Sequence, residues 1–246
     1  MIKMMALSTT DHIGLSNLAE VGMRLGILTY ALSHLKTEQV LHGLLLRGGL
    51  TIEIHALPFT PRPERRVLFQ HRPDQFAAAH PAKIARRFSL SYHEVATADD
   101  ITDPPDLMLV TVGALIGPRL LERTRVLNVH SGLIPAVRGL DAFKCAVHDG
   151  MPLGVSLHAI DAEVDRGEHI LSLPTPVYAD DTPATLARRH YEAEIALLTG
   201  FQDALRAQAP SLPGLEDRPA RKRMPVAVEA EMLARFPAYL ERYGQG

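Results

Sequence analysis

The chain has 246 residues, of which 46% are hydrophobic and 22% charged, and its formal net charge at pH 7 is -2. A nearly balanced charge gives no broad positive field to attract nucleic acid or an acidic membrane surface, so neither is expected as a partner. The single cysteine, Cys145, excludes an internal disulfide and a cysteine-rich metal site, and no metal is expected. No apolar run approaches the roughly 18 residues that a membrane span needs.

The first 22 residues do not resemble a secretory signal, because no long apolar segment precedes a small-residue cleavage site. The expected location is therefore cytoplasmic. The first convincing core strand begins just after Met23. Residues 1–22 are expected to be an N-terminal tail, with Met23 a candidate for the true start.

From Met23 onward, short apolar runs alternate with helical patterns, which is typical of an α/β sheet. Gly48-Gly49 ends the first predicted helix, and Thr182 with Pro183 begins the longest one. The predicted strands are 24–30, 52–57, 90–95, 107–112, 126–130, 154–160 and 170–178. The predicted helices are 35–47, 81–88, 118–122, 141–148, a long helix from 183 through 205, and 226–243.

This order of elements predicts a Rossmann-like α/β fold: an open, mostly parallel sheet with flanking helices, plus a C-terminal helical extension. Residues 23–207 are the expected catalytic domain, and 208–246 the expected linker and C-terminal helix. That last amphipathic helix is a candidate element for a homodimer. The segment 60–74 is rich in proline and arginine and is predicted to be a long surface loop.

Three predicted strands end in polar or glycine-containing stretches. They lead into Gly113, Asn128-Val-His130, and the loop after Ile160 that holds Asp165. Ligands of an open parallel sheet bind beyond the carboxyl ends of its strands, so these residues are expected to share one site. Asn128 and His130 are two residues apart in a strand and therefore point to the same side.

The segment from Asn128 to Gly139 resembles a motif of the folate-dependent formyltransferases, which include the phosphoribosylglycinamide, methionyl-tRNA and sugar N-formyltransferases. The family's Asn-x-His and Leu-Leu-Pro-x-x-(Arg)-Gly loop stand here as Asn128-x-His130 and Leu133-Ile-Pro-Ala-Val-Arg-Gly139. Its later acid, in a Leu/Val-Asp-x-Gly turn, stands here as Val164-Asp165-Arg-Gly167. One departure lies inside the motif, because Ser131-Gly132 occupies the place of a usual Pro-Ser or Ala-Ser pair.

The resemblance implies a formyltransferase with 10-formyltetrahydrofolate as co-substrate and Asn128, His130 and Asp165 as catalytic residues. It also implies that His158 lies beside the folate and that Arg138 contacts the acceptor. The pterin slot would be lined by two segments, which contribute Val112, Gly113, Ala114, Leu115 and Ile116, and Ile160 and Asp161.

The chemistry of these residue types agrees with formyl transfer. Attack of an amine on an amide-like formyl group builds negative charge on its oxygen, to which an Asn N–H and an imidazolium can donate. A carboxylate would favour the charged imidazole and orient the attacking amine or water. Taken singly, each residue also has a structural interpretation: Asn128 as a strand end, His130 as a structural histidine, Asp165 as a turn residue.

The range of possible acceptors is narrowed mainly by features of related enzymes that this sequence lacks. The chain has Thr29-Tyr-Ala-Leu-Ser-His34 in place of a glycine-rich phosphate loop, and about 40 residues after the long helix in place of a tRNA-binding barrel. The expected acceptor is therefore a small-molecule amine, such as an amino sugar on a nucleotide or a hydroxylamine-type metabolite. A 10-formyltetrahydrofolate hydrolase and a non-catalytic folate-binding protein remain as alternatives.

The arginine-rich loop allows two interpretations. It contains Arg62, Arg65, Arg66, His71 and Arg72, which could bind a phosphate of the acceptor. The other interpretation is a solvated surface loop.

Overall fold

The structure is a computed structural model that describes residues 22–61, 63–114, 116–161, 165–207, 212 and 214–246. Its centre is a seven-stranded sheet in the order β3-β2-β1-β4-β5-β6-β7. Strands β1 to β5 are parallel to one another, whereas β6 runs antiparallel to β5 and to β7. The strands are β1 (Met23–Tyr30), β2 (Leu50–Leu57), β3 (Ser91–Glu94), β4 (Leu107–Val110), β5 (Arg125–His130), β6 (Gly154–Ala159) and β7 (His169–Pro174).

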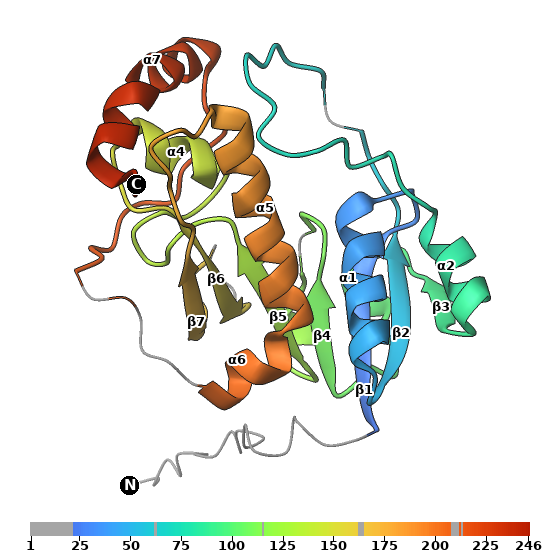
Figure 1. Cartoon of the computed structure of the whole chain (residues 1–246). Coiled ribbons are helices and arrows are strands. Elements are labelled where there is room, and N and C mark those ends of the chain that lie inside the picture. The colour runs from blue at the N-terminus through green and yellow to red at the C-terminus, as the bar shows by residue number, and fades with distance from the viewer. Residues whose placement is uncertain (1–21, 62, 115, 162–164, 208–211, 213) are drawn as a thin grey trace, which may run out of the picture.

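One face of the sheet is covered by α1 (Leu35–Arg47) and α5 (Pro183–Thr199), which lie side by side in Figure 1. Strand residues such as Ile27, Leu127 and Val129 enter the core on this side, together with α6 (Phe201–Ala207). The opposite face holds a smaller apolar cluster that includes Met108, Val126 and Leu120. Leu120 belongs to α3 (Pro118–Leu121), beside the short 3-10 helix η2 (Ala98–Asp100).

The predicted fold class is confirmed, and the predicted strands and helices are found within a few residues of their expected ends. The long helix predicted through Leu205 is wrong in one respect, because it breaks at Gly200 into α5 and α6. Thr199 Oγ1 donates back to the Ile195 and Ala196 carbonyls, and Gly200 then closes the turn. Such back-bonding by a hydroxyl weakens the helical ladder.

The C-terminal extension packs against α4 (Ala142–His148), as Figure 1 shows for α7 (Val226–Tyr243). Lys144 of α4 and Glu229 of α7 form an ion pair in which both side chains are 1% exposed. The segment before α7 runs beside the chain after β5, where Arg221 exchanges backbone hydrogen bonds with Arg138 and Leu140. No helix in the described part of the chain is long and apolar enough to cross a membrane.

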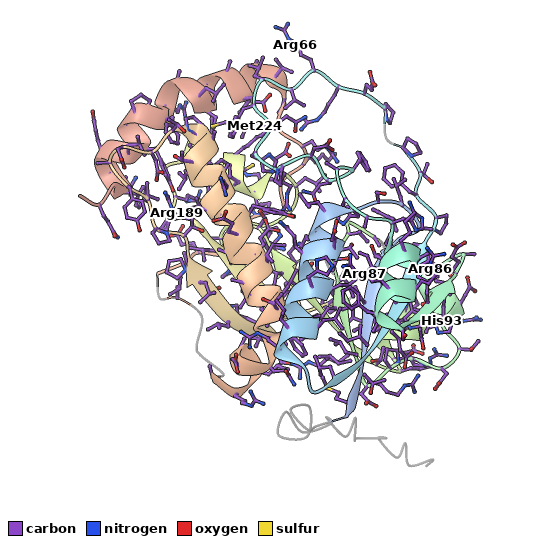
Figure 2. All side chains as sticks on the ribbon, turned by 45° about the vertical axis from the view of Figure 1, so that its right-hand side comes forward. Arg66, Arg86, Arg87, His93, Arg189 and Met224 are labelled. Atoms are coloured by element: carbon purple, nitrogen blue, oxygen red, sulfur yellow. The ribbon has the colours of Figure 1, made fainter. Side chains whose placement is uncertain are left out.

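The arginine-rich loop is held on the surface by specific contacts. Arg65 donates to Asp141 Oδ2 and to the Met224 carbonyl, and Arg72 forms an ion pair with Glu194. Arg66 points away from the body at the edge of the molecule in Figure 2 and is exposed. Arg62 lies outside the described residues. The loop arginines thus differ in role, since Arg65 and Arg72 tie the loop to acids of the domain.

The remaining helix is α2 (Pro81–Phe88), which begins at His80 and packs against β2 and β3. The ring nitrogen of His80 accepts the N–H of Ala82, and Ser89 ends the helix in a left-handed conformation. This helix and β3 lie at the edge of the sheet farthest from β5.

Candidate active site

Asn128 and His130 lie on the same side of β5, as their two-residue spacing predicted. The alternating residues Leu127 and Val129 pack on the α1 and α5 side, whereas Val126 packs on the opposite face. Asn128 and His130 share the side of Val126 because successive side chains of a strand alternate. Asn128 is half-buried and His130 is buried.

The ring of His130 has a partner on each nitrogen. Nε2 lies 2.8 Å from the Val137 carbonyl oxygen, which can only accept, so this nitrogen carries a hydrogen and donates it. Nδ1 faces Asp165, with 3.3 Å between Nδ1 and Oδ2. The ring therefore lies between the loop after β5 and the acid, in a fixed orientation.

Gly132 makes this orientation sterically accessible. A Cβ at this position would collide with the Val137 carbonyl oxygen and lie 2.9 Å from His130 Nε2. The departure of Ser131-Gly132 from the usual motif thus has a local physical reason, because the His130–Val137 bond occupies the space of a side chain.

Asp165 sits in a tight turn with a φ of 51°, a left-handed conformation that Asp and Asn tolerate better than most residues. The Gly139 N–H donates to its Oδ2 over 2.9 Å. Gly167 packs directly on β6, and a Cβ there would collide with the Ala159 carbonyl. These contacts bring Asp165 to His130 although the two residues are far apart in the sequence.

His158 connects Asn128 with Asp165. It lies opposite Asn128 in the β5–β6 pairing and is 2% exposed. Its Nδ1 donates to the Ala159 carbonyl at 3.1 Å, which leaves Nε2 to accept from Asn128 Nδ2 at 3.3 Å. Burial lowers the pKa of His158, against the opposing attraction of Asp165, and keeps the ring neutral. Nε2 also lies 3.7 Å from Asp165 Oδ1.

The two predicted folate segments meet on the same face of the sheet as Asn128. Ala114, Ile116 and Ile160 are partly buried and pack against one apolar cluster that includes Val110 and Val126. The surroundings fit a planar, partly apolar ring system, because apolar side chains there adjoin polar groups. Those groups include the exposed Asp161 and the Gly113 carbonyl, to which Tyr30 donates at 2.8 Å. Val112 is half-buried in the same connection, whereas Leu115 lies outside the described residues.

Arg138 turns toward the chain's own C-terminal segment. Its side chain is 6% exposed and donates to Asp217 Oδ1 at 2.8 Å and to the Arg218 carbonyl at 2.6 Å. The contact of Arg138 with an acceptor, implied by the family resemblance, stays a prediction.

Sequence patterns did not predict the buried polar contacts that His190 makes with Ser131, which directly follows His130 in the chain. Ser131 Oγ lies 3.1 Å from His190 Nε2, and His190 Nδ1 lies 2.8 Å from Thr175 Oγ1. Glu194, one helical turn further along α5, is 1% exposed and pairs with Lys36. A signal was present, since Ser131 departs from the family motif and polar residues four apart interrupt the apolar pattern of a helix.

Acidification is expected to destabilise the fold through His190. Burial lowers the pKa of His190 to about 4, with Arg72 and His130 adding to the effect and Glu194 opposing it. The unfolded state then binds more protons than the native state between pH 6.5 and 4, so stability falls as the pH falls through that interval. The loss is about 3 kcal/mol for this one group. Urea unfolding at several pH values should show a flatter profile for His190→Asn than for the parent, and equal slopes would contradict the assignment.

Comparison with known proteins identifies the family of this chain. A family model described as "Formyl transferase" matches residues 64–200, which is more than half of the chain. The chain belongs to the formyl transferase family. Formyltransferases of this family use 10-formyltetrahydrofolate. The family prediction is thereby confirmed, whereas the roles of the individual site residues stay predictions.

The sequence relatives of this formyl transferase family member include two bacterial proteins. One is a methionyl-tRNA formyltransferase of Ectopseudomonas mendocina, 30% identical over 67% of this chain and 51% of that protein. Another is a methionyl-tRNA formyltransferase of Pseudomonas putida (strain GB-1), 28% identical over 72% of this chain and 58% of that protein. The chain therefore spans little more than half the length of the curated relatives it matches.

Solved structures show the same fold. A sugar N-formyltransferase from Shewanella sp. superposes with a TM-score of 0.57 and 14% identity, covering 87% of each chain. Glycinamide ribonucleotide transformylase 1 from Symbiobacterium toebii gives a TM-score of 0.52 and 23% identity over 81% of this chain and 94% of its own. At these identities the likeness concerns the fold.

Proposed function

We propose that this protein transfers a formyl group from 10-formyltetrahydrofolate to the amine of a small-molecule acceptor. The observation that carries the proposal is the meeting of Asn128, His130 and Asp165 at the end of β5, with the His130 ring 3.3 Å from Asp165. Family membership supports the reaction class. Simple folate binding would not require this arrangement of a donor, an imidazole and a carboxylate.

Asn128 is the donor for the formyl oxygen. One N–H of its amide donates to His158 Nε2, and the same nitrogen carries a second N–H for a substrate oxygen. A fixed donor at the oxygen on which charge develops is commonly the largest electrostatic contribution to acyl transfer. Neutral His158 holds this amide in place. We do not assign His130 as a second donor to that oxygen, because its Nε2–H is directed at the Val137 carbonyl.

Asp165 and His130 transfer the proton that the attacking amine loses. The bound folate supplies the formyl group as an amide-like acyl group on nitrogen. As the new C–N bond forms and the old one breaks, a proton must move from the amine to the departing nitrogen. Asp165 accepts the proton from the attacking amine and shares it with the Nδ1 side of His130. The pair then returns that proton to the folate nitrogen as its bond to the formyl carbon breaks, so both residues end the cycle in their starting protonation states. No covalent bond to the protein is required.

The acceptor that we favour is an amino sugar on a nucleotide or a hydroxylamine-type metabolite. A sugar N-formyltransferase is among the proteins that share the fold over most of this chain, which is consistent with that class. Methionyl-tRNA is a second candidate, favoured by the names of the sequence relatives.

An acceptor screen with 10-formyltetrahydrofolate tests these proposals. The release of deformylated folate would be followed by absorbance with an amino sugar nucleotide, with hydroxylamine, with aminoacylated initiator tRNA and with water alone. Folate release that requires a small amine supports the proposed transfer, and release only with the charged tRNA supports the second candidate. Formate release at the same rate without any amine would instead show a hydrolase. No release under any condition contradicts catalysis.

Substitution of Gly132 by alanine is expected to slow formyl transfer without unfolding the protein. The added Cβ must displace the Val137 carbonyl and shift the His130 ring away from its present position. Misplacement of a reacting group by about 1 Å lowers rates by roughly a hundredfold. Steady-state kinetics should show a lower kcat with a nearly unchanged KM for the folate. An unchanged kcat would show that the His130–Val137 bond is unimportant.

A further inference from the structure

Two guanidinium groups converge on one carboxylate beside the candidate active site. Arg138 Nη2 lies 2.8 Å from Asp217 Oδ1, and Arg166 Nη2 lies 2.7 Å from Asp217 Oδ2. Each arginine therefore holds a different oxygen of the same carboxylate. Planar guanidinium groups arranged in this way also match phosphate oxygens, because the spacing of the oxygens is similar.

Both arginines neighbour Asp165, the proposed catalytic acid, along the chain or through one hydrogen bond. Arg166 directly follows Asp165, and Arg138 directly precedes Gly139, whose N–H donates to the Asp165 carboxylate. Because Arg166 and Gly139 both adjoin Asp165, we expect an anion held by both arginines to lie near that carboxylate. The pair and the acid belong to one continuous set of contacts.

The carboxylate comes from a distant and more exposed part of the chain. The Asp217 side chain is 52% exposed, whereas that of Arg138 is 6% exposed. The backbone around Asp217 is held separately, since Arg218 N–H donates to the Pro135 carbonyl and Arg221 N–H to the Arg138 carbonyl. Rotation of the Asp217 side chain would therefore withdraw its carboxylate from both arginines without moving the segment, while Arg138 keeps its hydrogen bond to the Arg218 carbonyl.

We propose that Arg138 and Arg166 bind an anionic group of the acceptor, a phosphate or a carboxylate, and that Asp217 is an intramolecular occupant which the acceptor displaces. This inference deepens the proposed function and rests on it for the identity of the ligand as an acceptor. Asp217 competes as a tethered group at roughly millimolar effective concentration or higher. It excludes weakly bound anions and admits a dianion or a ligand with further contacts.

Anion binding without folate or amine tests the site directly. Inorganic phosphate and, separately, acetate would be titrated calorimetrically at low ionic strength into the parent, Asp217→Asn and Asp203→Asn. Asp203 is a matched control, because it also lies between two arginines, Arg47 and Arg206, but on α6. We expect Asp217→Asn to bind phosphate or acetate at least about tenfold more tightly than the parent, since the tethered competitor is removed.

The two probes distinguish the chemical source of the anion. A larger gain for phosphate supports a phosphorylated acceptor, and a gain for acetate alone supports a carboxylate-bearing one. Arg166→Gln in the Asp217→Asn background should abolish the gain in either case. The proposal would be overturned if Asp217→Asn bound phosphate and acetate no more tightly than Asp203→Asn does. Because this titration involves no formyl transfer, its outcome is independent of whether the acceptor screen succeeds.

A kinetic measurement separates substrate recognition from a purely structural ion pair. O-phosphoethanolamine and ethanolamine form a matched pair of amines that differ only in the phosphate. Asp217→Asn should lower the KM for the phosphorylated amine and leave that for ethanolamine unchanged, whereas a structural role would shift both alike and contradict the proposal. Arg166→Gln on the parent background provides a second variant. It is expected to change the stability of the fold little, because the Arg166 side chain is 45% exposed. It should raise the KM for O-phosphoethanolamine alone.

Discussion

Replacing Asp165 with asparagine is expected to lower the rate of formyl transfer by about 10²- to 10⁴-fold, the usual contribution of a positioned acid–base group. The variant removes the negative charge that faces His130 Nδ1 at 3.3 Å and the group that accepts a proton from the amine. Binding of the folate should persist, because the predicted folate segments keep their packing against the apolar cluster that includes Val110 and Val126.

Asparagine is the sharpest substitution at this position because it preserves the turn. Asp165 has a φ of 51°, which asparagine adopts readily, and the amide oxygen can still accept the Gly139 N–H. Loss of activity would therefore report on charge and proton transfer and not on an unfolded loop. Pre-steady-state kinetics would measure the rate, and folate binding would be followed by fluorescence.

The control for this variant is Asp203→Asn, the same chemical change on α6, which should retain parental turnover. His130→Ala should match the loss in Asp165→Asn, and the double variant should lose little more, because the two side chains act on one proton. Near-normal turnover in Asp165→Asn would remove this residue from the mechanism.

Local patterns predicted the parts of the fold that depend on neighbouring residues. The alternation of apolar runs with helical patterns led to the correct sheet class, and the two-residue spacing placed Asn128 and His130 on one side of β5. By contrast, the break between α5 and α6 depends on Thr199, whose hydroxyl bonds to the preceding carbonyls. The apolar stripe of α5 continues into α6, so the periodicity of apolar residues alone did not reveal the break.

Contacts between distant residues could not be predicted from such patterns. Arg138 lies 79 positions from Asp217, and Lys36 lies 158 positions from Glu194. An isolated arginine or glutamate in a sequence carries no information about which opposite charge it will meet. The strand ends predicted only that Asp165 shares a site with His130. Its contact with the His130 ring was implied by the family resemblance alone, since it depends on the turn after β6 and on the close packing of Gly167.

Removal of the Glu194 carboxylate is expected to cause the largest loss of stability. Glu194 lies at the centre of three elements: Oε2 is 3.1 Å from Lys36 Nζ on α1, and Oε1 is 2.7 Å from Arg72 of the arginine-rich loop. Burial alone would raise the pKa of Glu194, but Arg72 and Lys36 hold it well below its ordinary value. The side chain is therefore charged throughout the neutral pH range.

Glu194→Gln should lower the free energy of unfolding by about 3–5 kcal/mol, because it leaves a buried cation without its partner. Lys36 is the critical group, since its side chain is 8% exposed and burial already lowers its pKa. The matched control is Glu192→Gln on the same helix, whose side chain is 59% exposed and pairs only with Arg188 among the described contacts. Loss of that surface pair should change stability by less than about 1 kcal/mol.

Urea denaturation would measure the stability losses of Glu194→Gln and Glu192→Gln, provided that the m-values are unchanged. A second substitution tests whether the unpaired Lys36 causes the loss in Glu194→Gln. Lys36→Met in the Glu194→Gln background should restore part of the stability, because it removes the unpaired buried charge and keeps a similar volume. Stability of Glu194→Gln alone should rise with pH, since a lysine with a lowered native pKa binds more protons in the unfolded state. Equal losses in Glu194→Gln and Glu192→Gln would show that the charges around Glu194 are solvated, and that the arginine-rich loop is held by its other contacts.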